Sequence, residues 1–350
     1  MKSQVIAIPR LIESKYDALY DLPKALKQHG FKKVLLTVGE GIDVLFKEQI
    51  ERLLKDETLD VTGPKVLEEL NVEKITPLAY KLDMYDVIIS MGGGKAIDTG
   101  KYVSFLKGIP FISVPTSISN DGFASSGASL IVDGERKSVN ANMPYGVIAD
   151  LTILSTAPER FYYSGLGDVV SKITASFDWQ YEANQGIGYV DHYALLTSKK
   201  SVNSVVRLPL PYINEGLFIK EVVDSLIMSG ISMEVAGNSA PASGSEHLIS
   251  HAMDKLVPGK YLHGVQVGIA TYIMALAQDY RVNRVRTFLT DTGFFDHVKK
   301  LEIQKSVIEE AVKLAPSIKP HRKTTIHDKG YMDKALEVIS GDEVLKRILI

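Results

Sequence analysis

Three short apolar runs, each ending at a glycine or proline turn, constrain the fold of this chain most strongly. The runs are Lys33–Val38, Asp86–Met91 and Phe111–Val114, and the turns after them are Gly39-Glu40-Gly41, Gly92-Gly93-Gly94 and Pro115. Apolar runs of this length between turn residues are typical of buried strands. Apolar residues at helical spacing in Leu45–Leu54 and Lys95–Leu106 indicate helices between them. Strands that alternate with helices predict a parallel sheet with both faces covered, whose ligands bind beyond the carboxyl ends of the strands.

The second half of the chain has a different pattern. Beyond Pro158, which suits the first turn of a helix, runs rich in β-branched residues largely disappear. Long segments of helical periodicity take their place at Asp168–Ala183, Glu215–Ala236 and Val265–Asp279. We expect an α/β dinucleotide-binding domain with a parallel sheet in residues 1–155, and an all-α domain that binds metal and substrate in residues 156–350. A hairpin turning at Asp133-Gly134 is expected to project from the sheet.

Size and charge exclude several classes of function. The 350 residues suffice for two domains that each bury a core. The formal net charge is -2, so no overall positive field attracts nucleic acid or an anionic membrane. No apolar run approaches the roughly 18 residues of a membrane span, and the N-terminal run before Pro9 is too short for a signal peptide. We therefore expect a cytoplasmic protein, and the absence of cysteine excludes disulfides and a redox thiol.

Three histidines lie within one short stretch, at His247, His251 and His263. Positions i and i+4 share one face of a helix, so His247 and His251 can point into one cavity, and neutral imidazole is the commonest protein ligand for zinc. Two hydrogen-bonded, partly buried histidines are the alternative. A zinc site here would need an oxygen ligand, because the chain has no thiolate, and Asp168 is a candidate. A simpler interpretation places Asp168 just inside the start of a helix, where its charge offsets the helix dipole.

The glycine run Gly92-Gly93-Gly94 follows a predicted strand and opens a predicted helix. In that context the N–H groups of glycines can meet a pyrophosphate, and the helix N-terminus stabilises its charge. The motif is not a P-loop, which needs glycine at Ile89 and a hydroxyl residue at Ala96. Nor is it the usual G-x-G-x-x-G, because Ile97 stands at the third glycine position. A plain tight turn is the alternative.

Two other features at the strand ends favour a ligand. The segment Pro115–Gly122 carries hydroxyls and a carboxylate at the end of a buried strand. Buried loops this polar are more often binding surfaces than turns. Glu40 is either a solvated turn residue or an acceptor for an adenosine ribose hydroxyl, as acids after early strands are in dinucleotide sites.

Taken in chain order, these motifs resemble a known enzyme group. The motifs are Gly92-Gly93-Gly94-Lys95-x-x-Asp98, Pro115-Thr116-Ser117-x-Ser119-Asn120-Asp121-Gly122, Gly167-Asp168, Ser245-Glu246-His247 with His251, and His263-Gly264. Together they are similar to the metal-dependent group that contains glycerol dehydrogenase, iron-type alcohol dehydrogenases and dehydroquinate synthase. Within it, the chain most resembles the archaeal sn-glycerol-1-phosphate dehydrogenase family.

The resemblance implies zinc-dependent reduction of dihydroxyacetone phosphate by NADH or NADPH to sn-glycerol 1-phosphate, for archaeal-type membrane phospholipid synthesis. It implies zinc ligands at Asp168, His247 and His263, and substrate contacts at His251 and Asp121, so Asp121, Asp168 and His251 are the candidate catalytic residues. Besides Glu40, the expected cofactor contacts are Gly92, Gly93, Gly94, Lys95, Ala96, Ile97, Asp98, Thr116, Ser117, Ile118, Ser119 and Ser125. The site is expected in a cleft between the two domains, and the chain is expected to form a homo-oligomer. Either His251 or a zinc-shell water would supply the proton.

Three other functions are compatible with parts of this pattern. A glycerol dehydrogenase would share the fold and the metal but would need no phosphate-binding cation, for which Lys260 and His321-Arg322-Lys323 are candidates. Such a charged cluster can equally be a solvated face. A cyclase of the dehydroquinate synthase type would need a denser set of lysines and arginines. A nucleotide-binding protein without turnover would have no need of three convergent metal ligands.

Overall fold

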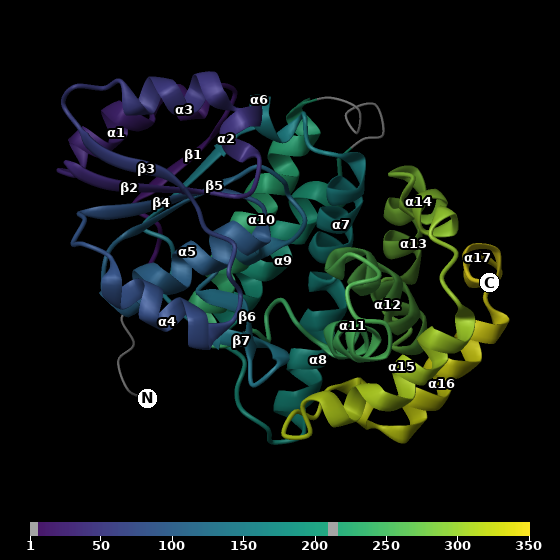
Figure 1. Ribbon diagram of the computed structural model, residues 1–350. Coiled ribbons are helices and arrows are strands. Elements are labelled where there is room, and N and C mark those ends of the chain that lie inside the picture. The colour runs from purple at the N-terminus through teal and green to yellow at the C-terminus, as the bar shows by residue number, and fades with distance from the viewer. Residues whose placement is uncertain (1–5, 209–215) are drawn as a thin grey trace. The chain divides into compact units, whose positions relative to one another are not determined.

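The computed structural model describes residues 6–208 and 216–350. They form two compact units, Met1–Ala157 and Pro158–Ile350 (Figure 1). The first unit is built on a parallel sheet and the second is mostly helical. The expected fold class, an α/β part followed by a helical part, is therefore confirmed.

The sheet of the first unit has six strands in the order β1-β8-β5-β4-β2-β3, and all its pairs are parallel. The strands are β1 (Leu11–Lys15), β2 (Lys33–Val38), β3 (Asp60–Val66), β4 (Val87–Gly92), β5 (Phe111–Pro115) and β8 (Gly146–Asp150). The three strands expected from the sequence, β2, β4 and β5, are adjacent. From β2 the chain continues to β3, at one edge of the sheet. From β4 it continues in the opposite direction across the sheet, to β5. Such a reversal of direction marks the place where parallel sheets bind ligands, beyond the carboxyl ends of β2 and β4.

Helices cover both faces of this sheet. They are η1 (Ala18–Asp21), α1 (Leu22–Gln28), α2 (Ile42–Leu45), α3 (Lys47–Leu54), α4 (Val72–Lys81), α5 (Gly94–Lys107), η2 (Asp121–Ala124) and α6 (Leu151–Leu154). Val34, Leu36 and Val38 of β2 share one core cluster with α1 and α3. Because successive strand residues point to opposite faces, Leu35 is buried on the side where α4 and α5 lie (Figure 1). The helix expected at Leu45–Leu54 is interrupted at the buried Phe46, whose φ of -118° and ψ of 40° are not helical.

The hairpin is a separate two-stranded antiparallel sheet of β6 (Gly127–Val132) and β7 (Glu135–Asn140). Its turn residues, Asp133 and Gly134, have φ values of 53° and 76°. Two positive φ values are the signature of the turn that matches strand twist, and aspartate followed by glycine adopts it readily. The hairpin expected at Asp133-Gly134 is therefore confirmed.

The second unit consists of α7 (Glu159–Val170), α8 (Lys172–Asn184), α9 (His192–Val206), α10 (Gly216–Ala236), α11 (Ser245–Leu256), α12 (His263–Ala277), α13 (Val282–Asp291), α14 (Phe294–Lys300), α15 (Lys305–Ile318), η4 (Thr325–His327), α16 (Lys329–Gly341) and α17 (Glu343–Ile348). The expected helix start at Glu215 lies outside the described residues. Gly237, with φ of 68°, ends α10 as expected from the sequence. None of the helices in the described ranges is long and apolar enough to cross a membrane.

A close contact between two helices organises this unit. Helix α12 is buried along almost its entire length, and α7 packs against it. A Cβ added to Gly167 of α7 would overlap the carbonyl oxygen of Gly264, and one added to Gly264 would overlap that of Ser164. Only glycine at these positions lets the two backbones touch.

This contact corrects the expected start of a helix at Asp168. The glycine-rich stretch before Asp168 suggested the beginning of a helix, yet α7 begins at Glu159 and Asp168 lies in its last turn. Helix α7 continues through this stretch, and Gly167 serves its packing on α12. The alternative role for Asp168, an acid that offsets the dipole of a helix N-terminus, is therefore wrong.

Candidate metal centre and nucleotide-binding loops

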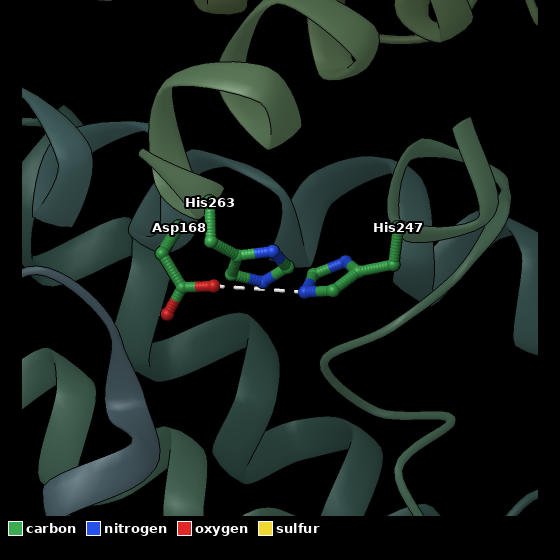
Figure 2. A group of neighbouring side chains, drawn as sticks. All are labelled: Asp168, His247 and His263. Atoms are coloured by element: carbon green, nitrogen blue, oxygen red, sulfur yellow. Dashed lines mark ion pairs between the residues drawn. The ribbon is translucent and has the colours of Figure 1, made fainter. Parts of the chain in front are cut away.

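Asp168, His247 and His263 come from α7, α11 and α12 and converge on one point of the second unit (Figure 2). Each offers one ligand atom, and these atoms all lie within 4.8 Å of one another. Asp168 and His247 are buried and His263 is partly buried. Residues almost 100 positions apart in the sequence thus form one cluster of donors.

The donor set fits a divalent metal ion. Oδ1 of Asp168 and Nε2 of His247 lie 3.6 Å apart (Figure 2), close to the roughly 3.3 Å between two ligands that each lie about 2.0 Å from a tetrahedral zinc. Two imidazoles and one carboxylate leave a fourth position open, which is the arrangement of catalytic zinc sites. The same three ligands also suit ferrous iron.

Neighbouring charges keep the Asp168 carboxylate ionised, as a metal ligand must be, and they favour the protonated ring of His247 when no metal competes for it. Burial alone would raise the pKa of Asp168, but the ammonium of Lys172, 3.1 Å from Oδ2, and the two histidines hold it below its ordinary value. Burial alone would lower the pKa of His247, whereas its bonds to the carboxylates of Asp168 and Glu246 raise it. Asp168 is therefore an anionic donor at neutral pH.

His251 lies beside this triad. It follows His247 by one turn of α11, and its ring centroid is 5.9 Å from that of His263. The rings of His247 and His263 are 5.2 Å apart. The histidines singled out in the sequence are therefore neighbours in space, with His251 outside the group of ligand atoms.

The glycine run of the first unit joins a strand to a helix, as expected. Gly92 ends β4, Gly93 precedes α5 and Gly94 begins it. A Cβ at Gly94 would meet no atom within 4 Å, and one at Gly93 would meet only Oγ of Ser117, at 3.9 Å. The packing of the chain itself therefore does not require glycine at these two positions. The N-terminus of α5 is open to a ligand, and its N–H groups suit an anion.

The hydroxyl-rich segment lies next to the glycine run. The N–H of Thr116 donates to the carbonyl of Gly92 at 3.0 Å. Oδ1 of Asn120 accepts from the N–H of Gly122 at 2.8 Å and so starts the short helix η2, which carries Asp121. The buried Lys101 donates from Nζ to the carbonyls of Gly122 and Gly127, the latter at 2.7 Å. This ammonium ties the segment to the hairpin.

Several residues expected to contact the cofactor are buried within the first unit. They are Ala96, Ile97, Asp98, Ile118 and Ser125. Oδ2 of Asp98 accepts from the N–H of Ser129 at 3.2 Å, and Oδ1 lies 3.8 Å from Nζ of Lys101. Burial raises the pKa of Asp98 and lowers that of Lys101. The Asp98 carboxylate thus has a structural role in holding the hairpin, and its contact with a cofactor stays a prediction.

A second carboxylate near Glu40 was not identified from the sequence. Glu40 is exposed after β2, and its N–H donates to Oε1 of Glu68 at 3.1 Å. Glu68 follows β3, and a Cβ on Gly39 would lie 2.8 Å from the same oxygen. Two acids therefore lie at this end of the sheet. Only the parallel pairing of β2 with β3 brings them together, and β3 lacks the apolar run that would have revealed it.

The candidate phosphate-binding cations have different surroundings. Lys260 is exposed, as are His321 and Lys323. The guanidinium of Arg322 donates to both carboxylate oxygens of the buried Glu182, at 2.6 to 3.1 Å, and to the carbonyl of Ser243. Arg322 is thus part of the interior of the second unit.

Comparison with known proteins agrees with this geometry. The model of the family described as iron-containing alcohol dehydrogenase matches residues 13–158. A probable glycerol dehydrogenase from Sinorhizobium meliloti superposes with a TM-score of 0.76 at 19% identity, covering 97% of this chain and 99% of that one. Glycerol dehydrogenase from Schizosaccharomyces pombe superposes with a TM-score of 0.77 at 19% identity, covering 97% of this chain and 91% of that one. The fold is that of these dehydrogenases.

Similar sequences narrow the class. Glycerol-1-phosphate dehydrogenase [NAD(P)+] from Sulfurisphaera tokodaii is 33% identical over 98% of both chains. The protein of the same name from Pyrococcus furiosus is 35% identical over 95% of this chain and 97% of the relative. The one from Thermococcus kodakarensis is 40% identical over 87% of this chain and 88% of the relative. This chain belongs to the glycerol-1-phosphate dehydrogenase family, and it is an oxidoreductase.

The contact between α7 and α12 yields a first prediction. Gly167→Ala places a methyl group against the carbonyl of Gly264, so the helices must separate and carry Asp168 away from His263. We expect the free energy of unfolding, measured in urea, to fall by about 3 kcal/mol, the upper part of the range for overpacking. We also expect metal binding to weaken.

Gly341→Ala is the matched control. Gly341 also lies in a helix, α16, but a Cβ there would meet no atom within 4 Å. This variant should be as stable as the wild type or more so, by up to about 1 kcal/mol. Equal stability of the two variants would show that the contact at Gly167 is not tight.

Proposed function

We propose that this enzyme reduces dihydroxyacetone phosphate to sn-glycerol 1-phosphate with NADH or NADPH and a zinc ion. The observation that carries the proposal is the convergence of Asp168, His247 and His263. The chain that contains this triad matches nearly the entire length of relatives named glycerol-1-phosphate dehydrogenase [NAD(P)+]. Product formation in this way would supply the backbone of archaeal-type phospholipids.

The protein groups divide the work of a ketone reduction. Asp168, His247 and His263, which come from three helices, would hold a zinc ion. The bound zinc would supply Lewis-acid polarisation of the carbonyl that receives the hydride. His251, next to His263, is proposed to hold or relay a proton at its ring. Asp121 is proposed to accept a hydrogen bond from the free hydroxyl of the substrate.

The loops of the first unit are proposed to bind the nicotinamide cofactor. The N-terminus of α5, at Gly93 and Gly94, would bind the pyrophosphate, and Thr116–Ser119 would flank the nucleotide. Glu40, with Glu68 beside it, would accept a bond from the adenosine ribose.

The second candidate is a glycerol dehydrogenase that acts on an unphosphorylated polyol. Arg322, a candidate for binding the phosphate, donates its hydrogen bonds to Glu182. This contact favours the alternative, because a glycerol dehydrogenase needs no phosphate-binding cation. The sequence identity of 33 to 40% to relatives named glycerol-1-phosphate dehydrogenase, over most of the chain, favours the first function.

Substrate identity is tested directly. With NADH or NADPH, we expect rapid loss of 340 nm absorbance with dihydroxyacetone phosphate and slow loss with dihydroxyacetone. Because three contacts would fix the ketone, one face should be reduced and a single enantiomer formed. A dehydrogenase specific for sn-glycerol 3-phosphate should leave the product unoxidised. Ready oxidation would contradict the assigned enantiomer, and brisk activity on glycerol alone would favour the second candidate.

Metal dependence is tested by removal and return. Dialysis against a chelator should abolish turnover, and zinc should restore it. Elemental analysis of the untreated enzyme should find one zinc per chain. One iron per chain instead would contradict zinc and identify iron as the metal of the site. His263→Ala should lose both the metal and activity, whereas His251→Ala should retain the metal while losing activity. Equal metal loss in the two variants would refute the separate roles.

The cofactor site is tested by Gly93→Val. The structure has room for a side chain at Gly93, so the variant should fold and keep its metal. The branched side chain would occupy the approach to the N–H groups at the start of α5, so we expect NADH affinity to fall at least about tenfold. Fluorescence titration with NADH measures this change. Unchanged affinity in a folded variant would place the pyrophosphate elsewhere.

A further inference from the structure

Each of the three proposed metal ligands has a second polar atom, and a buried side chain holds it. Oδ2 of Asp168 lies 3.1 Å from Nζ of Lys172. Nδ1 of His247 lies 2.9 Å from Oε1 of Glu246, and Nδ1 of His263 lies 3.1 Å from Oγ of Ser250. Lys172, Glu246 and Ser250 are all buried. The ligands are therefore held by protein groups on the side away from their common point.

We infer that Glu246 and Ser250 are positioning residues that fix both histidines as the tautomer with the proton on Nδ1 and the lone pair on Nε2. This inference rests on the proposed metal centre. A metal-binding imidazole needs a free lone pair, and a bond from its other nitrogen sets which nitrogen carries the proton.

For His247 the direction of the bond is fixed by chemistry. An ionised carboxylate only accepts hydrogen bonds, so Nδ1 of His247 donates to Glu246. Glu246 is itself immobilised: Oε1 also accepts from the N–H of Gly244 at 2.6 Å, and Oε2 accepts from the hydroxyl of Thr174 at 2.8 Å. The Nε2 atom of His247 is then left facing Oδ1 of Asp168, at 3.6 Å.

For His263 the direction follows from a chain of three bonds. Asp254 can only accept, so the amide nitrogen of Gln266 faces it, at 2.9 Å, and the amide oxygen faces Ser250. The single hydroxyl proton of Ser250 is donated to that oxygen at 2.7 Å. Ser250 must therefore accept from Nδ1 of His263. Two unrelated sets of bonds thus give the two histidines the same tautomer.

The test measures zinc affinity and the histidine tautomer, independently of activity. Glu246→Leu removes the acceptor, so the affinity for zinc, measured by chelator competition, should fall about 10- to 100-fold. Glu246→Gln keeps an oxygen that can accept from His247, so it should lose less affinity than the leucine variant. Nitrogen-15 NMR of the metal-free wild type should show Nδ1 protonated in both histidines.

Asp150→Ala is the control for a loss of stability. Asp150 is a buried carboxylate of the first unit, it accepts from the N–H groups of Leu19 and Thr152, and it makes none of the contacts described at the three ligands. This variant should be less stable but should bind zinc within twofold of the wild type. Wild-type affinity in Glu246→Leu, equal weakening in Asp150→Ala, or an Nδ1 that carries no proton in either histidine of the metal-free protein would overturn the inference alone. A wild type that binds no zinc would overturn the proposed metal centre as well.

Discussion

The proposed metal centre depends on a contact between two backbones. Gly167 of α7 and Gly264 of α12 touch without side chains between them, and each is next to a proposed ligand, Asp168 or His263. The separation of these two ligands is therefore set by main-chain geometry rather than by flexible side chains. A larger residue at either glycine would push the helices apart and change the distance between the ligands, although the donor atoms themselves would stay the same. This explains why glycine accompanies the acid and the histidine in the motifs Gly167-Asp168 and His263-Gly264.

The third ligand is positioned by a buried polar network. The segment before α11 is held at successive residues: Arg322 binds the carbonyl of Ser243, Glu246 binds the N–H of Gly244, and Asp178 accepts from the N–H of Ser245 at 2.6 Å. Burial, together with the nearby charge of Glu246, raises the pKa of Asp178 to about 6. A network of this kind stabilises a structure only when all its members are paired. The bonds at Ser243, Gly244 and Ser245 fix the first turn of α11, where His247 lies.

The sequence predicted the fold class and the central strands because β2, β4 and β5 are buried on both faces and read as continuous apolar runs. It did not reveal β3, which contains Pro64 and is partly exposed, or the edge strand β1. The sequence indicates Asp168 as a candidate ligand but not its place in the last turn of a helix, because glycine is typical of helix boundaries and here marks close packing. Glu68 could not be predicted, because it meets Glu40 through a contact between segments that are distant in the chain. The partners that hold the ligands could not be predicted either, because their roles depend on the direction of hydrogen bonds, which residue spacing does not encode.

The donor set of nitrogen and oxygen atoms has a consequence for chemical durability. Centres built on thiolates lose ligands when oxidants convert cysteine to sulfenic, sulfinic or sulfonic acid. This chain has no cysteine, so peroxide has no ligand to attack by that route. Imidazole and carboxylate are instead displaced by acid, since a proton competes with the metal for each donor. The proposed centre would thus escape thiol oxidation but would be sensitive to acidification.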